Sequence, residues 1–282
     1  MCCKDFNIEV IFLLKRIVTS IIGLPIVVLI IAYGGLPMKL LMVLISAIGM
    51  FEFYRAFNRG TKIENYISYL FIAIYYAFID RLNSDILLMM LFSYMLLNLA
   101  FLVLNHSKMT PFDAAINVFG FLYIGFLLSS IYLTRVHPYG KFLVWLIFTS
   151  AWGSDTFAYF TGITIGKHQF TPILSPKKTI EGVIGGILGA MLIGFLYAFV
   201  LTKTTNIGNE INAITLFVIM SGFGAAFSVL GDLTASAIKR YTKIKDYGKL
   251  IPGHGGIMDR FDSIIFTAPV VYMVLRLILI YK

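Results

Sequence analysis

The chain has 282 residues, of which 59% are hydrophobic and 13% are charged. Soluble globular domains carry about 25% charged residues, so this composition excludes an ordinary water-soluble fold and predicts a polytopic membrane protein. The formal net charge of +9 is not accompanied by a zinc-finger pattern, an RNA-recognition motif or a long basic run, and we therefore expect no nucleic-acid partner. The positive charge instead suits loops that face the anionic head groups of a lipid bilayer.

The only two cysteines, Cys2 and Cys3, lie next to each other in the N-terminal segment. Their adjacency excludes a disulfide framework and a cysteine-based zinc site, and lipidation is an alternative that no myristoylation pattern accompanies. The first apolar run follows Lys15 and Arg16 and lacks a small-residue cleavage site. It therefore predicts a retained helix rather than a signal peptide.

Apolar runs continue to the end of the chain, and most approach the length of about 20 residues that a spanning helix requires. The fold class that they predict is all-α, a polytopic transmembrane helical bundle of about nine spans. The expected spans are roughly 17–34, 38–54, 65–80, 86–104, 113–134, 142–161, 183–202, 212–235 and 257–280.

The lysines and arginines predict the orientation of these spans. With a cytoplasmic N-terminus, most of the 23 lysines and arginines fall in inner segments, as the positive-inside rule requires. The loops 162–182 and 236–256 then lie together in the cytoplasm. Residues 1–140 read as scaffold helices with few polar side chains. Polar and glycine-rich clusters interrupt the spans in residues 141–282, which we expect to be the catalytic region.

Asp155 lies within the sixth predicted span. A carboxylate at the membrane centre costs about 2.5–3.5 kcal/mol on insertion scales, so it should face a cavity or a partner. A hydrogen bond to Ser154 or Thr156 would be a purely structural use of Asp155. The small polar residues that surround it favour a functional one.

The segment Ser175-Pro-Lys-Lys-Thr-Ile-Glu predicts the start of the seventh span, with Ser175 as the N-cap and Pro176 in the first helical position. Lys177 and Lys178 would then lie near the positive end of the helix dipole, where a bound phosphate would offset the repulsion. A solvated lysine pair that attracts lipid phosphates is the alternative. Glu181, one turn beyond Lys177, is expected to pair with that lysine or to point at a metal.

Four glycines follow in this span, Gly182, Gly185, Gly186 and Gly189. They form two overlapping GxxxG pairs, which are typical of closely packed membrane helices. We expect them to bring this helix against another helix of the catalytic region.

At helical spacing, Asp232 and Ser236 share a face of the eighth span with Lys239 and Arg240. A carboxylate and two cations therefore meet on one surface.

The loop that follows carries Asp246 and then Gly255 and Gly256, whose backbone N–H groups could approach phosphate oxygens. Asp259 and Asp262 share one face of the last predicted helix. Hard carboxylate oxygens suit Mg²⁺, which also binds substrate phosphates. The scattered histidines argue against zinc, and no P-loop pattern occurs. These residues predict metal-assisted phosphoryl or nucleotidyl transfer at the cytoplasmic membrane face.

The pattern of this region resembles the signature of the phosphatidate cytidylyltransferases, also called CDP-diacylglycerol synthases. The resemblance is carried by Ser236-x-x-Lys-Arg-x4-Lys245-Asp246 and by Pro252-Gly-His-Gly-Gly-x-x-Asp259-Arg260-x-Asp262-Ser263. Ser154-Asp-Thr-x-Ala-Tyr-x-x-Gly and Ser175-Pro-Lys-Lys-Thr-x-Glu-Gly-x-x-Gly-Gly are similar to upstream motifs of the family. The resemblance implies a helical membrane enzyme, usually a homodimer, that converts CTP and phosphatidate to CDP-diacylglycerol and pyrophosphate.

The resemblance also implies roles for particular residues. Asp232 and Asp259 are expected to hold Mg²⁺, with Asp246 as a third acid and with room for a second monovalent or divalent cation. The expected catalytic set also contains Lys239, Arg260 and His254, the last as a hydrogen-bond donor to phosphate. The expected cofactor-binding set is Asp155, Lys177, Lys178, Glu181, Lys239, Arg240, Gly255 and Gly256.

Two other functions remain open at this point. A CTP-dependent kinase of a polyprenol-type lipid would use the same nucleotide and metal but would release CDP. A cation- or proton-coupled transporter would use the intramembrane acids, although no inverted repeat is visible. The compact chain favours a bacterial inner membrane as its location.

Overall fold

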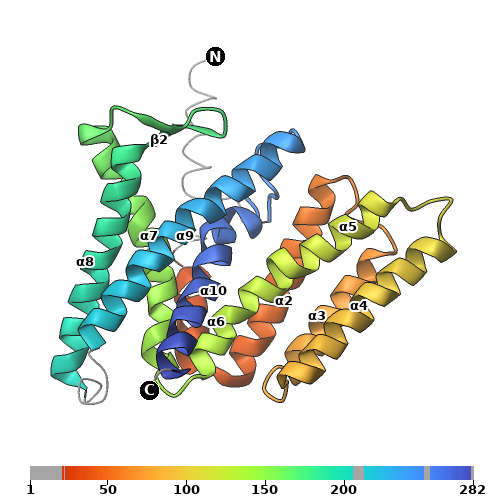
Figure 1. Cartoon of the computed structure of the whole chain (residues 1–282), viewed down its shortest axis with the longest axis horizontal. Coiled ribbons are helices and arrows are strands. Elements are labelled where there is room, and N and C mark those ends of the chain that lie inside the picture. The colour runs from red at the N-terminus through yellow and green to blue at the C-terminus, as the bar shows by residue number, and fades with distance from the viewer. Residues whose placement is uncertain (1–20, 22, 206–212, 251–254, 281–282) are drawn as a thin grey trace. The chain divides into compact units, whose positions relative to one another are not determined.

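The computed structural model describes residues 21, 23–205, 213–250 and 255–280. These residues are mostly helical, with one small sheet, which confirms the all-α class (Figure 1). A short apolar helix, Gly23–Tyr33, comes first. The elements that follow are α2 (Gly35–Ala56), α3 (Asn65–Phe78), α4 (Ser84–Leu104), α5 (Pro111–Gly120), the π-helix η1 (Phe121–Phe126), α6 (Leu127–Val136), α7 (Gly140–Ile165), β1 (Gln169–Thr171), β2 (Ser175–Thr179), α8 (Ile180–Thr204), α9 (Ala213–Tyr241) and α10 (Met258–Ile280).

Within the described residues, five helical segments are long and apolar enough to cross a membrane, and the chain is a multi-pass membrane protein. They are α2, α4, the continuous segment Pro111–Val136, α8 and α9. The number of spans and the cytoplasmic N-terminus stay predictions. Cys2, Cys3 and His254 lie outside the described residues.

Local sequence signals explain where several helices begin. The side chain of Asn83 accepts the N–H of Ile86 at 2.8 Å and caps α4. Asp113 accepts the N–H of Thr110 at 2.7 Å, and Pro111 occupies the first helical turn of α5.

The chain forms two compact units. One comprises Met1–Ser129 with Ile244–Asp259, and the other comprises Ser130–Lys243 with Arg260–Lys282. The functional division at residues 140 and 141 stays a prediction.

In the first unit, α2 packs against α3, α5 and η1, and α4 packs against α3 and α5. Buried tyrosines link these helices, since the hydroxyls of Tyr54 and Tyr94 both donate to the carbonyl oxygen of Asn117, at 3.0 and 2.9 Å. Arg59 forms ion pairs with Glu64 and Asp113. The two tyrosine hydrogen bonds hold α2 and α4 against α5.

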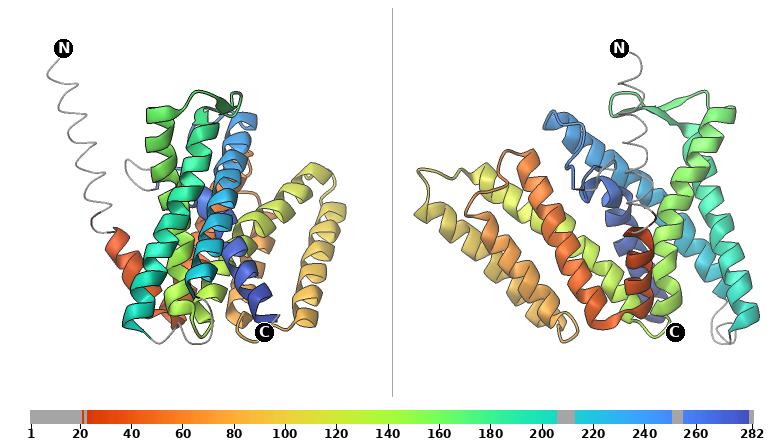
Figure 2. Two further views of the ribbon diagram at one scale, coloured as in Figure 1. Left: turned by 60° about the vertical axis from the view of Figure 1, so that its left-hand side comes forward. Right: turned by 180° about the vertical axis from the view of Figure 1, so that it is seen from behind.

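In the second unit, α7, α8 and α9 all pack against one another, and Figure 2 shows the three helices side by side from two directions. The predicted close packing of the glycines is confirmed. A Cβ atom at Gly182 would lie 2.9 Å from the carbonyl oxygen of Ala158, and one at Gly186 would lie 2.7 Å from that of Ser154. The partner helix is therefore α7, which carries Asp155.

From Arg260 onward, α10 belongs to the same unit as α9 and packs against it. The hydroxyl of Thr267 donates to the carbonyl oxygen of Gly224 at 3.1 Å. A Cβ at Gly231 would lie only 2.5 Å from the carbonyl oxygen of Asp262. The residue next to Asp232 therefore lies in close contact with the first turns of α10.

Two predicted boundaries are wrong. Residues Ser175–Thr179 form β2 rather than the first turn of a helix, because they pair with β1 in an antiparallel hairpin. The loop predicted to begin at 236 begins later, because α9 continues to Tyr241 and ends where Lys243 adopts a left-handed conformation, at φ 57°.

Candidate active site

The β1–β2 hairpin joins α7 to α8 and carries the two lysines of the Ser175-Pro-Lys-Lys motif (Figure 1). Thr179 is the N-cap of α8, since its hydroxyl accepts the N–H of Gly182 at 3.1 Å. Lys177 and Lys178 consequently precede the helix instead of lying in its first turn.

Glu181 closes the open end of the hairpin, where β1 and β2 join α7 and α8. Its Oε2 accepts the backbone N–H groups of Lys167 and His168 at 3.1 and 3.2 Å, and its Oε1 lies 2.6 Å from His168 Nδ1. The predicted pairing of Glu181 with Lys177 is therefore wrong, because the strand separates them. In this structure Glu181 shapes the hairpin that presents the lysines.

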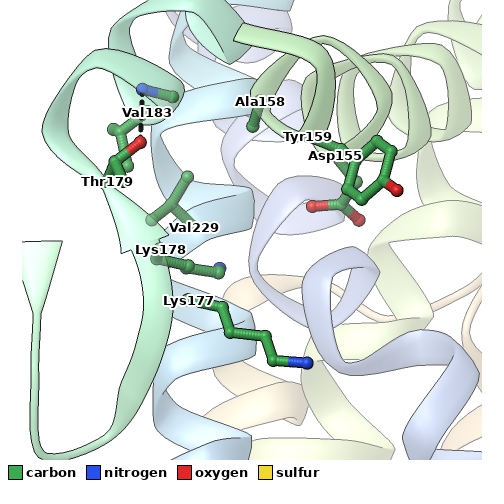
Figure 3. A pocket seen from close by; sticks show the side chains of 9 residues that line it. Asp155, Ala158, Tyr159, Lys177, Lys178, Thr179, Val183 and Val229 are labelled. Carbon is green, nitrogen blue, oxygen red and sulfur yellow. Dashed lines mark hydrogen bonds between the residues drawn. The ribbon is translucent and has the colours of Figure 1, made fainter. Parts of the chain in front are cut away.

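A cavity of about 210 Å³ opens beside the hairpin. Figure 3 shows the side chains of Asp155 and Tyr159, from α7, and those of Lys177 and Lys178, from β2, around the same space. This volume lies below the 300–1,000 Å³ typical of drug-sized ligands, so it suits a head group better than a whole nucleotide. The cavity is lined by Asp155, Ala158, Tyr159, Lys177, Lys178, Thr179, Gly182, Val183 and Val229.

Charge on the cavity wall is balanced by partners from several elements. The Nζ of Lys178 lies 2.5 Å from Oδ2 of Asp232, and both side chains are about three-quarters buried. Asp155 interacts electrostatically with Lys178 and Asp232, and its side chain also contacts that of Ser263. The structure thus brings together the predicted site residues Asp155, Lys178 and Asp232 from α7, β2 and α9.

Asp262 and Lys239 extend this cluster. Asp262 interacts with Asp232, Asp155 and Lys239, and its Oδ1 accepts the N–H of Ser263 at 2.8 Å. The sequence places Asp262 within the signature without giving it a role. Three carboxylates and two lysines therefore share one polar region of the second unit, which can hold an anionic group between cations and carboxylates.

The first unit contains the other part of the signature, in the segment Ile244–Asp259. Asp259 Oδ2 accepts the backbone N–H of Tyr247 at 2.8 Å and that of Gly256 at 3.0 Å. The N–H of Gly256, which the sequence offers to phosphate, is therefore already bonded to Asp259, and that expectation needs correction. Gly255 has φ 86°, a conformation that favours glycine.

Asp246 lines a second cavity, of about 590 Å³, together with Arg55, Lys245 and Lys249. Arg55 was not predicted from the sequence, nor was Glu52, a buried carboxylate of the same helix that accepts the N–H of Met258 at 2.9 Å. The argument that singles out Asp155, a carboxylate inside an apolar helix, applies equally to Glu52 and would have found it.

Two of the remaining predicted site residues, Arg240 on α9 and Arg260 on α10, have exposed side chains. Across the part of the chain that the structure describes, no group of three or more His, Cys, Asp or Glu residues is arranged to hold a metal ion. The assignment of Asp232, Asp246 and Asp259 as metal ligands stays a prediction.

Comparison with known proteins shows which family this chain resembles. The family model described as the cytidylyltransferase family matches residues 14–278. A phosphatidate cytidylyltransferase of Staphylococcus saprophyticus is 32% identical over 92% of this chain and 98% of its own length. That of Bacillus subtilis is 30% identical over 93% of this chain and 97% of its own. That of Thermotoga maritima is 38% identical over 56% of this chain and 57% of its own.

Proposed function

The chain belongs to the cytidylyltransferase family, and we propose that its polar clusters join CTP to phosphatidate, which forms CDP-diacylglycerol and releases pyrophosphate. The protein is a membrane-embedded nucleotidyltransferase of phospholipid biosynthesis. The observation that carries the proposal is the cavity in which Lys177 and Lys178 meet apolar residues of α7, α8 and α9.

The reaction forms one bond and breaks one. A phosphate oxygen of phosphatidate attacks the α-phosphorus of CTP, and the bond from that phosphorus to the oxygen that bridges it to the β-phosphorus breaks. Pyrophosphate carries away the electron pair. The attacking phosphate monoester has a second pKa of about 6, by analogy with phosphoserine, so it is already ionised at neutral pH and needs no strong base.

Because both substrates are anions, the residues have two main tasks, neutralising charge and aligning the reacting groups. Lys177 and Lys178 would bind the phosphate of phosphatidate, while Ala158, Val183 and Val229 would contact the apolar part of the lipid next to it. Asp232 holds the Lys178 ammonium in place.

Lys239, near Asp262, would balance charge on the triphosphate, together with Arg240 and Arg260. His254 would donate a hydrogen bond to a phosphate oxygen.

Mg²⁺ is the cofactor that the donor set fits best, since carboxylate oxygens are hard ligands. The candidate ligands are Asp232 in the second unit, and Asp246 and Asp259 in the first. Magnesium commonly uses only one or two protein carboxylates and takes its remaining ligands from water and substrate phosphates, so a three-residue protein cage is not required. When bound, the ion would neutralise charge on the triphosphate.

The charge bias of the loops supports an active site on the cytoplasmic face of the membrane. The bacterial relatives support a bacterial inner membrane as the location. A homodimer is part of the same proposal and rests on the resemblance to the family.

The test uses purified protein in detergent with phosphatidate, Mg²⁺ and CTP labelled in the cytosine. Label should enter the lipid phase only when phosphatidate is present, and EDTA should abolish the transfer. Active-site loading can be checked separately by CTP-dependent thermal stabilisation. If CTP and Mg²⁺ stabilise the protein but no label enters phosphatidate, the proposal is wrong. A polyprenol and γ-labelled CTP would then test the lipid-kinase alternative, which predicts a labelled lipid phosphate and free CDP.

A further inference from the structure

The signature loop, which we define as the described residues 244–250 and 255–259, is attached to α2 through a buried carboxylate. Glu52 is only 2% exposed. Its Oε2 accepts the backbone N–H of Met258 at 2.9 Å, and the N–H of Ile257 also bonds to this carboxylate. The first N–H groups of a helix have no partner within it, and a negative charge there is favourable. Glu52 thus supplies from another helix the acceptor that the start of α10 needs.

The same carboxylate accounts for two glycines of the loop. A Cβ atom at Gly256 would lie 2.4 Å from both carboxylate oxygens of Glu52, and one at Gly248 would lie 2.1 Å from Oε1. Gly256 is not among the residues with positive φ, so the space that Glu52 occupies, rather than backbone conformation, requires glycine there. The loop can approach α2 this closely only without side chains at these two positions.

Two further contacts complete the attachment. One turn after Glu52, Arg55 Nη2 donates to the carbonyl oxygen of Tyr247 at 2.6 Å. Asp259 Oδ2 accepts the N–H groups of Tyr247 and Gly256. Helix α2 therefore bonds to the loop at two places, Tyr247 and Met258. Asp259 links the two parts of the loop, because it accepts N–H groups from both of them.

Groups that could meet a substrate stay accessible in this arrangement. Lys245, Asp246 and Lys249 are exposed, and they line the larger cavity with Arg55. The attachment uses backbone groups of the loop and the side chains of Glu52, Arg55 and Asp259. It does not use the side chains of Lys245, Asp246 and Lys249. An attachment of this kind fixes where Asp246 and Asp259 lie before any substrate arrives.

We propose that Glu52 is a positioning residue for nucleotidyl transfer, which fixes the signature loop so that its carboxylates and lysines are ready to receive the nucleotide and its metal. This inference rests on the proposed function. Displacing a reacting group by 1 Å can cost about 100-fold in rate, and we expect a loss of that order in kcat for Glu52→Ala.

The experiment compares Glu52→Ala and Glu52→Gln with Glu64→Gln in the full-length protein. Glu64 is a matched control, because it is also a buried carboxylate of the same unit but pairs with Arg59. Two quantities are measured, the transfer of cytidine label to phosphatidate and the hydrogen exchange of the amides of Tyr247, Gly256 and Met258. Both Glu52 variants should lose turnover and exchange these amides faster, whereas Glu64→Gln should change neither. If Glu52→Ala does not fold, Glu52→Gln, which keeps the volume of the side chain, carries the test.

A second comparison separates positioning from general destabilisation. Gly256→Ala alone should lose activity, because its methyl group meets the carboxylate of Glu52. In Glu52→Ala/Gly256→Ala that methyl group enters the space vacated by the carboxylate, so the double variant should be no worse than either single variant.

Unchanged exchange at the three amides would overturn the inference, and so would faster exchange with unaltered turnover, or fully additive losses in the double variant. A wild-type protein that transfers no cytidine label would overturn the proposed function and the catalytic role of Glu52 with it. The exchange measurement does not depend on turnover and would still report whether Glu52 holds the loop, so the two failures are distinguishable.

Discussion

Replacing Gly186 by alanine is expected to push α8 away from α7. The new Cβ would lie 2.7 Å from the carbonyl oxygen of Ser154 and 3.0 Å from the Cβ of Ala158. The first of these atoms belongs to the backbone of a helix and cannot rotate away. Overpacking of this kind costs about 1–3 kcal/mol.

Gly153 of α7 provides a matched control in the same helix pair. A Cβ at Gly153 would meet only the side chain of Ile193, whose flexible end, Cδ1, would lie 2.6 Å away. Both substitutions remove a glycine from a helix interior, and each should gain about 1 kcal/mol in helix propensity. That gain cancels between the variants, so their unfolding free energies should differ by about the overpacking cost, 1–3 kcal/mol.

Thermal unfolding of both variants in one detergent measures this difference. Each kcal/mol corresponds to about 2–4 °C in a protein of roughly this size, so Gly153→Ala should unfold at a higher temperature than Gly186→Ala by several degrees. Because Asp155 on α7 and Lys178 ahead of α8 line one cavity, Gly186→Ala should also transfer less cytidine label. Equal midpoints for the two variants would refute the claim that this backbone contact sets the separation of the helices.

Three further changes have defined outcomes. Thr179→Ala removes the N-cap of α8 and should cost about 1 kcal/mol in unfolding free energy, whereas Thr179→Ser should restore most of it; an unaffected midpoint in the alanine variant would contradict the cap. Lys178→Met should lower kcat/KM for phosphatidate by about 100-fold, and Lys203→Met, at the far end of α8, should not; equal values for the two variants would remove Lys178 from the site. Asp232→Ala and Asp259→Ala should each abolish transfer while membrane insertion is retained, and activity in both would end their assignment as metal ligands.

The general character of the fold follows from the sequence because membrane helices carry strong local signals. Apolar length alone predicted where α4, α8 and α9 lie, and small residues at four-residue spacing predicted the close packing of α8. The predicted start of α8 was wrong, because Ser175-Pro resembles the start of a helix as closely as Thr179 does. Pairing of β2 with β1, a non-local contact, decides between them.

The candidate site shows the same division. The residue types around Asp155, Lys178 and Asp232 indicate a site that handles anionic groups, because charged side chains in an apolar chain are costly unless they have a function or a partner. Their partners could not be predicted from helical spacing, because Lys178 reaches Asp232 from a separate element. Likewise, Gly256 looks like a phosphate-binding glycine in the sequence, yet its N–H bonds to Asp259.

By itself, then, the sequence determined the class of the protein, the positions of most helices and the chemical character of its polar segments, because hydrophobicity and charge act on neighbouring residues along the chain. Only the tertiary structure decided which polar groups meet. Glu52 lies about 200 positions before Met258, and the carboxylate accepts that N–H through space. Contacts of this kind depend on how helices pack, and helix packing depends on shape complementarity that local patterns do not encode.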